Sequence, residues 1–105
     1  MPLENKKLSI IVPIFNEIKI IEKFITSLSN TFEKKNCQYI FIDDGSFDGT
    51  VEKTQLVLNN IFNKNDFKYV RLNKNFGKAK AVKEGIKFIE GEYTLLIDSD
   101  LEYLS

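Results

Sequence analysis

The feature that most constrains the fold of this sequence is an alternation between short apolar runs and longer segments with helical periodicity. The runs have the pattern of strands in a buried or half-buried sheet. They are residues 8–15, 39–42, 67–72 and 93–97. The helical segments repeat apolar residues every three or four positions, over residues 17–32, 51–61 and 79–89. This β-α-β-α-β-α-β order predicts parallel strands joined by right-handed crossovers.

Polar residues and glycines predict where the helices begin and end. Asn16 is placed to cap the first helix, and Asp48 or Thr50 can cap the second. Gly91 is expected to end the third helix. The expected inner face of that helix consists of Ala79, Val82, Ile86 and Ile89. Each helix can therefore cover the sheet with one apolar face.

The expected fold class is α/β, with a mostly parallel sheet in the order 3-2-1-4 and helices on both faces. In this order the first and fourth strands lie side by side where the winding reverses. Ligands in such sheets bind beyond the carboxyl ends of the strands at that reversal. The loops on that edge are residues 13–17, 43–50, 73–78 and 98–102. Nearly every residue that could take part in chemistry is therefore expected on one edge.

The absence of one residue type excludes several kinds of active site. The 105 residues contain no His, so they cannot form a His–Cys zinc site, a catalytic triad or a His general base. The single cysteine, Cys37, excludes an internal disulfide, fits a reducing compartment and is expected to be buried. With 43% hydrophobic residues, the chain suffices for one domain with a modest core.

The charges are unevenly distributed along a chain whose formal net charge is zero. Residues 64–87 include eight basic and two acidic residues, whereas residues 88–105 include five acidic residues and no basic ones. Two interpretations remain open. The charges either belong to two solvated faces, or they place a cationic region beside an acidic site, as an anionic ligand held through a metal ion requires.

Two aspartates follow the fourth predicted strand. Asp98 and Asp100 are two positions apart, so in extended backbone both carboxylates can face one ion. Carboxylate oxygens suit Mg²⁺ or Mn²⁺. Glu102, two positions further, could add a ligand or be solvated. The alternative is that the Asp-Ser-Asp segment is only a polar turn.

Several other polar residues lie at the same predicted edge. Asp44 is a candidate to accept hydrogen bonds from a nucleobase or ribose, or else it shapes a turn. For Asp43 a turn or cap role and a functional role both remain open. Glu17 provides either first-turn electrostatics or a ligand contact. Lys78, with backbone N–H groups at a helix start, could cradle a diphosphate. Neither G-x-G-x-x-G nor G-x-x-x-x-G-K-[ST] occurs, which disfavours nicotinamide cofactors and P-loop ATPases.

Five blocks of this sequence together resemble the nucleotide-binding half of family 2 inverting glycosyltransferases, which have the GT-A fold. The blocks are residues 8–17 (LSIIVPIFNE), 42–50 (IDDGSFDGT), 72–78 (LNKNFGK), 91–93 (GEY) and 98–101 (DSDL). In this order and spacing they are highly specific and cover nearly the whole chain. The last two blocks are most similar to the branch that transfers a hexose to dolichyl or undecaprenyl phosphate. The resemblance implies a Rossmann-like, partial GT-A fold.

The resemblance also implies a nucleotide-sugar site with a divalent metal ion. The nucleotide-sugar residues that it implies are Pro13, Phe15, Glu17, Asp44, Lys78, Asp98 and Ser99. The implied ligands of Mg²⁺ or Mn²⁺ are Asp98, Asp100 and Glu102. Phe15 stands where the family usually has Tyr, and Glu102 stands where the polyprenyl branch commonly has Gln.

The activity implied by the resemblance is transfer of a hexose from a UDP- or GDP-linked donor to polyprenyl phosphate or a saccharide. The reaction inverts the anomeric carbon, and the metal ion stabilises the departing nucleoside diphosphate. Such a reaction serves cell-envelope polysaccharide or glycolipid synthesis. The expected location is the cytoplasm, at the cytoplasmic face of the membrane in the full-length protein. No nucleic-acid partner is expected.

Residues 1–105 are expected to form one nucleotide-sugar-binding domain that is truncated after the Asp-x-Asp motif. No residue is assigned as the catalytic base, so the chain alone is expected to have no transferase turnover. Residues 93–97 are expected to be an exposed edge strand that favours self-association. The alternative function is a non-catalytic nucleotide- or partner-binding remnant of such an enzyme.

Overall fold

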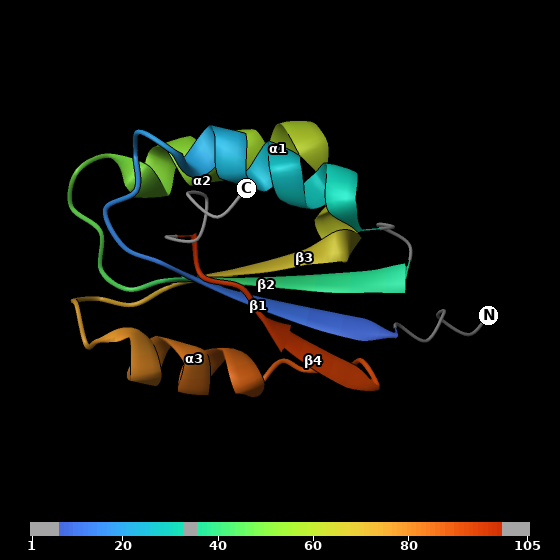
Figure 1. Cartoon of the computed structure of the whole chain (residues 1–105). Helices are drawn as coiled ribbons and strands as arrows, with labels where there is room; N and C mark the ends of the chain where they lie inside the picture. Colours follow the sequence, from blue (N-terminus) through green and yellow to red (C-terminus); the bar gives the residue numbers. More distant parts are fainter. Residues whose placement is uncertain (1–6, 33–35, 100–105) are drawn as a thin grey trace.

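Four parallel strands form a single sheet at the centre of the chain (Figure 1). The computed structural model describes residues 7–32 and 36–99. The strands are β1 (Leu8–Ile14), β2 (Cys37–Asp43), β3 (Phe67–Arg71) and β4 (Tyr93–Leu96). Their order is β3-β2-β1-β4, and all three neighbouring pairs are parallel. The predicted strand order is confirmed, with β1 next to β4 where the winding reverses.

Helices cover both faces of the sheet, as predicted. The helices are α1 (Ile21–Thr31), α2 (Thr50–Ile61) and α3 (Lys78–Ile86), with a short 3-10 turn at Lys64–Asp66. Figure 1 shows α1 and α2 above the sheet and α3 below it. The right-handed crossovers place α3 opposite the other two helices because β4 returns to the far side of β1.

The alternating side chains of β1 divide the core into two layers. Ile10, Val12 and Ile14 pack with the apolar residues of α1 and α2. Ile11 points to the other face, where it packs with residues of β2 and α3. Cys37 is buried as a free cysteine, as expected. Both faces of β1 and β2 are covered, which is why these two runs are almost continuously apolar.

The predicted end of α3 was wrong, and so was most of its predicted inner face, although Ile89, beyond the helix, does pack against the core. The structure buries Ala81 and Gly85, whereas Ile86 is 53% exposed and the helix ends at Ile86 rather than at Gly91. A Cβ atom on Gly85 would lie 3.0 Å from Cγ2 of Ile11. Small residues therefore form the contact face because α3 packs very close to the sheet. Apolar spacing alone cannot reveal so close an approach.

The predicted cap of α1 was also wrong. The helix begins after Ile20, and Asn16 has a left-handed backbone with φ 50°. The Asn16 side-chain oxygen instead accepts a hydrogen bond from the N–H of Phe47 (2.9 Å). Asn16 N–H donates to the hydroxyl of Ser46 (2.8 Å). Asn16 thus joins the loops that follow β1 and β2.

Two residues, Gly49 and Asp48, shape the start of α2. Gly49 occupies the cap position with φ 97°, and the Asp48 carboxylate accepts a hydrogen bond from the N–H of Thr50 (3.0 Å). Desolvation tends to raise the pKa of Asp48, but the hydrogen bonds from the Thr50 hydroxyl and N–H outweigh it, so the pKa is lowered. Neither predicted residue is therefore the cap residue, which is Gly49, although Asp48 does bind the first N–H group of α2.

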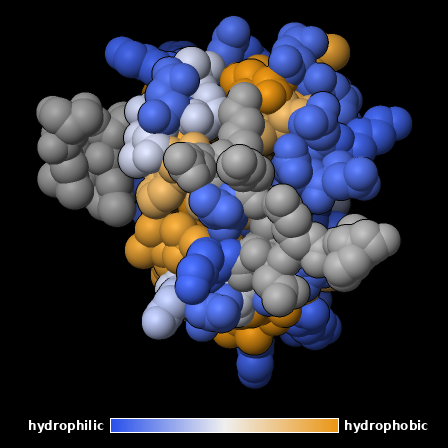
Figure 2. Space-filling view, turned by 90° about the vertical axis from the view of Figure 1, so that its right-hand side faces the viewer, coloured by the Kyte–Doolittle hydropathy of each residue, from blue (hydrophilic) through white to orange (hydrophobic). Residues whose placement is uncertain are grey.

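Strand β4 lies at the edge of the sheet, and all four of its residues are exposed. Leu95 is 37% and Leu96 is 49% exposed. Figure 2 views the molecule from the side where the strands begin, and it shows apolar patches between hydrophilic areas. None of the helices in the described part of the chain has the length and apolar character needed to cross a membrane.

Candidate functional site

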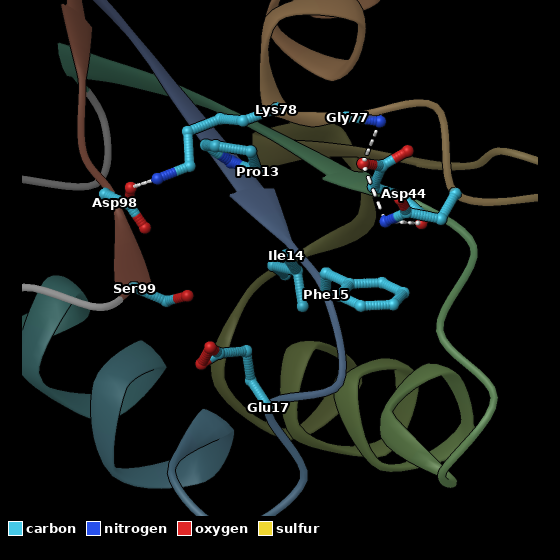
Figure 3. Close-up of a pocket in the computed structure, with 10 residues that line it drawn as sticks. Pro13, Ile14, Phe15, Glu17, Asp44, Gly77, Lys78, Asp98 and Ser99 are labelled. Atoms are coloured by element: carbon cyan, nitrogen blue, oxygen red, sulfur yellow. Dashed lines mark hydrogen bonds and ion pairs between the residues drawn. The ribbon is translucent and has the colours of Figure 1, made fainter.

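A pocket of about 230 Å³ lies at the carboxyl ends of the strands. The loops after β1, β2, β3 and β4 all contribute to it, as the winding of the sheet predicts. Its lining residues are Pro13, Ile14, Phe15, Glu17, Asp44, Asn75, Gly77, Lys78, Asp98 and Ser99. Figure 3 shows these side chains converging from both sides of the end of β1.

The structure brings together seven of the nine residues that sequence reasoning assigned to the site. These seven are Pro13, Phe15, Glu17, Asp44, Lys78, Asp98 and Ser99. The other two, Asp100 and Glu102, lie outside the described residues. Ile14, Asn75 and Gly77 also line the pocket but were not assigned to it. The Asn-x-Gly spacing just before α3 was a signal that could have identified the last two.

The carboxylate of Asp44 joins the end of β2 to the loop before α3. One oxygen accepts the N–H of Phe76 (2.8 Å) and the other accepts the N–H of Gly77 (2.9 Å). The side-chain amide of Asn75 lies 3.2 Å from both the carboxylate and the main-chain oxygen of Asp44. Asp44 is only 3% exposed, so this carboxylate is buried between the two loops. Asp44 therefore holds the loop before α3 through these hydrogen bonds and also lines the pocket.

Gly45 allows the two loops to pack backbone against backbone. Its φ is +79°, and a Cβ atom there would lie 2.3 Å from the carbonyl carbon of Lys74. No side chain fits such a position. Any larger residue would therefore push the loop before α3 away from β2 and change the shape of the pocket.

Asp43 does not line the pocket and instead shapes the turn after β2. It is fully buried, and one carboxylate oxygen accepts the N–H of Ser46 (2.7 Å). No described residue gives the other oxygen a hydrogen bond. Burial raises the pKa of Asp43, and the hydrogen bonds from Ser46 only partly oppose this shift. The turn interpretation of Asp43 fits this geometry.

Lys78 and Asp98 form an ion pair across one end of the pocket (Figure 3). Lys78 is the first residue of α3, and Asp98 follows β4. The side chains are 54% and 21% exposed, respectively. Figure 3 shows the Glu17 side chain at the end of the pocket that lies away from Lys78, with Ser99 between Asp98 and Glu17. The pocket thus has a cation at one end and carboxylates at both.

An aromatic side chain forms another wall. Phe15 is 37% exposed, and its ring packs edge-to-face with that of Phe47, with the centroids 5.9 Å apart and the planes at 70°. Phe47 is itself 81% exposed on the outer side of this pair. An exposed ring beside a polar pocket can stack on a planar ligand group.

The described part of the site offers few side-chain ligands for a metal ion. Residues 7–32 and 36–99 contain no group of three or more His, Cys, Asp or Glu side chains suited to a metal. Asp98 does, however, offer hard oxygen ligands and already faces a cation, the Lys78 ammonium. A divalent cation therefore fits the chemistry of this position.

Comparison with protein families gives a match over almost the entire chain. Residues 9–105 match the family described as Glycosyl transferase family 2. The chain belongs to glycosyl transferase family 2. This family membership confirms the identification made from the sequence blocks.

Named relatives of this family 2 chain share about a third of its residues. It is 31% identical to a dolichol-phosphate mannosyltransferase of Pyrococcus furiosus, over 92% of this chain and 26% of the relative. It is 35% identical to a dolichyl-phosphate beta-glucosyltransferase of Dictyostelium discoideum, over 94% of this chain and 32% of the relative. The chain therefore spans about a quarter to a third of these two proteins.

Solved structures confirm the GT-A fold of this family 2 chain. Residues 1–349 of S. aureus TarS in complex with UDP-GlcNAc match with a TM-score of 0.78 and 32% identity, over 90% of this chain and 26% of TarS. PcManGT of Pyrobaculum calidifontis, a mannosyltransferase in complex with GDP-Man and Mn²⁺, matches with a TM-score of 0.80. At 22% identity, over 92% of this chain and 28% of PcManGT, that likeness concerns the fold alone.

Proposed function

We propose that residues 1–105 form the donor-binding domain of a family 2 glycosyltransferase and that the pocket holds a nucleotide sugar. The observation that supports this most is the convergence of an exposed ring, a lysine and carboxylates from four separate loops on one pocket. TarS, which is 32% identical, has been solved with UDP-GlcNAc. A UDP- or GDP-linked hexose is therefore the proposed class of donor.

Each wall of the pocket suits one part of such a donor. The ring of Phe15 offers an apolar surface for the base, and Pro13, Glu17 and Asp44 lie near enough to line the base and ribose. The N-terminus of α3 and the ammonium of Lys78 can hold the diphosphate. Ser99, which is buried beside the pocket, completes the site.

The proposed metal ion is Mg²⁺ or Mn²⁺, held by Asp98 together with Asp100 and Glu102. When bound, the ion offsets the negative charge of the nucleoside diphosphate as it leaves. The proposed reaction is displacement at the anomeric carbon with inversion. Two relatives act, by name, on dolichol or dolichyl phosphate, which favours a polyprenyl phosphate acceptor at the cytoplasmic face of a membrane.

The acceptor could instead be a saccharide. One relative, 35% identical over 92% of this chain and 22% of its own length, is a poly-beta-1,6-N-acetyl-D-glucosamine synthase of Staphylococcus aureus. No residue is assigned as a general base. An acceptor phosphate that is already ionised needs none, whereas an acceptor hydroxyl does.

Thermal shift measurements with UDP and GDP test this function. Either nucleotide should raise the melting temperature when Mg²⁺ or Mn²⁺ is present, because a ligand at a hundredfold excess over its dissociation constant stabilises the fold by about 2.7 kcal/mol. Asp100→Ala should abolish the metal-dependent part of the shift, whereas the control Glu90→Gln should retain it. Equal shifts with and without EDTA would remove the metal ion from the proposal. No shift with either nucleotide would reject the function.

A further inference from the structure

The ion pair between Lys78 and Asp98 joins two groups for which the proposed function requires different partners. The ammonium of Lys78 contacts Oδ2 of Asp98, and both residues line the pocket. In the proposed function Lys78 binds the diphosphate and Asp98 binds the metal ion. In the structure the two groups instead pair with each other, so each stands where a ligand of the other would bind.

The geometry allows this pair to separate. The Lys78 side chain is 54% exposed and the Asp98 side chain is 21% exposed, so water can replace either partner. Pairs that are this exposed contribute little to the stability of a fold. A lysine is also a point charge on a flexible stem, and its ammonium can move by several ångströms while α3 stays in place.

We propose that Lys78 is an exchangeable counter-ion, which neutralises Asp98 before ligands bind and moves to the diphosphate when a divalent cation binds Asp98. This inference rests on the proposed function. A metal ion that binds Asp98 alone must displace the ammonium from that carboxylate. A diphosphate that binds alone draws the ammonium away from Asp98 before a metal ion has replaced it. When both ligands bind, the ammonium pairs with the diphosphate and the Asp98 carboxylate with the metal ion.

The exchange makes metal and nucleotide binding cooperative. By thermodynamic linkage, the factor by which the nucleotide strengthens metal binding equals the factor by which the metal strengthens nucleotide binding. Lys78 acts here as a binding residue whose charge opposes metal binding and favours nucleotide binding. Removing that charge must then change the two affinities in opposite directions, which a purely structural role of Lys78 does not predict.

Lys80 provides a matched control two residues further along α3. Its ammonium pairs with Glu84 on the same helix, at 3.3 Å, and it does not line the pocket. Lys80→Met therefore removes the same charge from the same helix without affecting Asp98. Any effect of net charge alone appears equally in both variants.

The test is a titration of the 105-residue chain with Mn²⁺ alone, and with UDP or GDP at saturating Mn²⁺. Lys78→Met should bind Mn²⁺ alone several-fold more tightly than the original chain and should bind the nucleotide several-fold more weakly. Lys80→Met should match the original chain in both. Lys78→Gln should behave like Lys78→Met, because both lack the charge. Unchanged or weaker Mn²⁺ binding in both Lys78 variants, or no Mn²⁺ binding by any protein, overturns the proposal.

A second background locates the effect at Asp98. In an Asp98→Asn chain the ammonium has no carboxylate to neutralise, so adding Lys78→Met should leave Mn²⁺ affinity unchanged. A gain of the same size in both backgrounds overturns the exchange. The metal-only titration needs no nucleotide. If no protein binds UDP or GDP while Mn²⁺ affinity responds as expected, the proposed function fails and the competition of Lys78 with the metal is retained.

Discussion

The buried carboxylate of Asp44 holds the loop before α3 in the form that completes the pocket. Its two oxygens accept the N–H groups of Phe76 and Gly77, and the amide of Asn75 adds a third donor. These donors come from residues more than thirty positions away in the sequence. A single side chain thus couples the end of β2 to the start of α3, where the diphosphate is proposed to bind.

Asp44→Asn should weaken both the fold and nucleotide binding. The asparagine presents an NH₂ group to one of the two backbone N–H groups and leaves that buried donor unpaired, at a cost of about 1–3 kcal/mol. Urea unfolding and nucleotide titration measure the two effects. Glu90→Gln, a change at an exposed carboxylate, should alter neither. Unchanged stability in Asp44→Asn would contradict the hydrogen-bonding role.

Asp43 should give the fold a pH dependence of opposite sign to that of a salt-bridged carboxylate. Burial raises its pKa in the folded state, so the proton binds more tightly there than in the unfolded chain. The stabilisation by this proton is fully present below the unfolded pKa of about 3.9. It is lost as the pH rises through the folded pKa.

Asp43→Asn removes this titration. The melting temperature of the variant minus that of the original chain should therefore increase as the pH is raised from about 4. Glu52→Gln, at an exposed position on α2, serves as the control and should show a smaller change. A difference that stays constant across this range, or that decreases with pH, would refute the assignment.

At the scale of the elements, two glycines set the distances between loops and layers. Gly45 brings the loop after β2 against the backbone of Lys74, and Gly85 brings α3 against Ile11. These close approaches position the pocket edge and the α3 layer relative to β1 and β2. The fold therefore depends on the absence of a Cβ atom at particular points.

Gly45→Ala should destabilise the chain more than Gly77→Ala does. Both glycines have positive φ, so both variants incur backbone strain of about 1–3 kcal/mol. A Cβ on Gly77 meets nothing within 4 Å, whereas one on Gly45 overlaps the Lys74–Asn75 backbone. The overlap should add about 1–3 kcal/mol. Equal free energies of unfolding for the two variants would argue against backbone contact at Gly45.

The strand order and the edge that holds the pocket could be predicted because they depend on local patterns and a general rule of winding. Four apolar runs and three helical periods are visible in the sequence, and the reversal between β1 and β4 follows from them. The role of Asn16 could not be predicted, because its partner Phe47 is far along the chain. The burial of Asp44 and the close packing at Gly85 could not be predicted for the same reason, since contact with a distant loop or strand leaves no local signal.

For the molecule as a whole, the exposed edge of β4 is the feature expected to govern behaviour in solution. Tyr93, Leu95 and Leu96 are all exposed, and β4 pairs with β1 on one side only within the described chain. An apolar edge strand can pair with a second copy of the same chain. Self-association through residues 93–97 is therefore a prediction for the chain of 105 residues.

Leu96→Lys should reduce this self-association, because a charge on an edge strand opposes pairing with another strand. Light scattering at several protein concentrations should show a lower average mass than for the original chain. Leu56→Lys is the matched control, since Leu56 is 67% exposed on α2, away from the edge. The edge is not the cause if both variants lower the mass equally, or if the original chain is monomeric throughout.

The pairing of β1 with β4 also determines at what stage of folding the pocket can form. Pro13 lies in β1, early in the sequence. Asp98 and Ser99 follow β4, so they reach the pocket only after β4 has been synthesised and has docked beside β1. During synthesis, then, the pocket should form only after residues 93–99 have been made and β4 has docked beside β1. Contacts between such distant segments form slowly. An exposed edge strand is also among the first elements to open, so amide hydrogen exchange in β4 should report loss of the ligand site before the rest of the sheet unfolds.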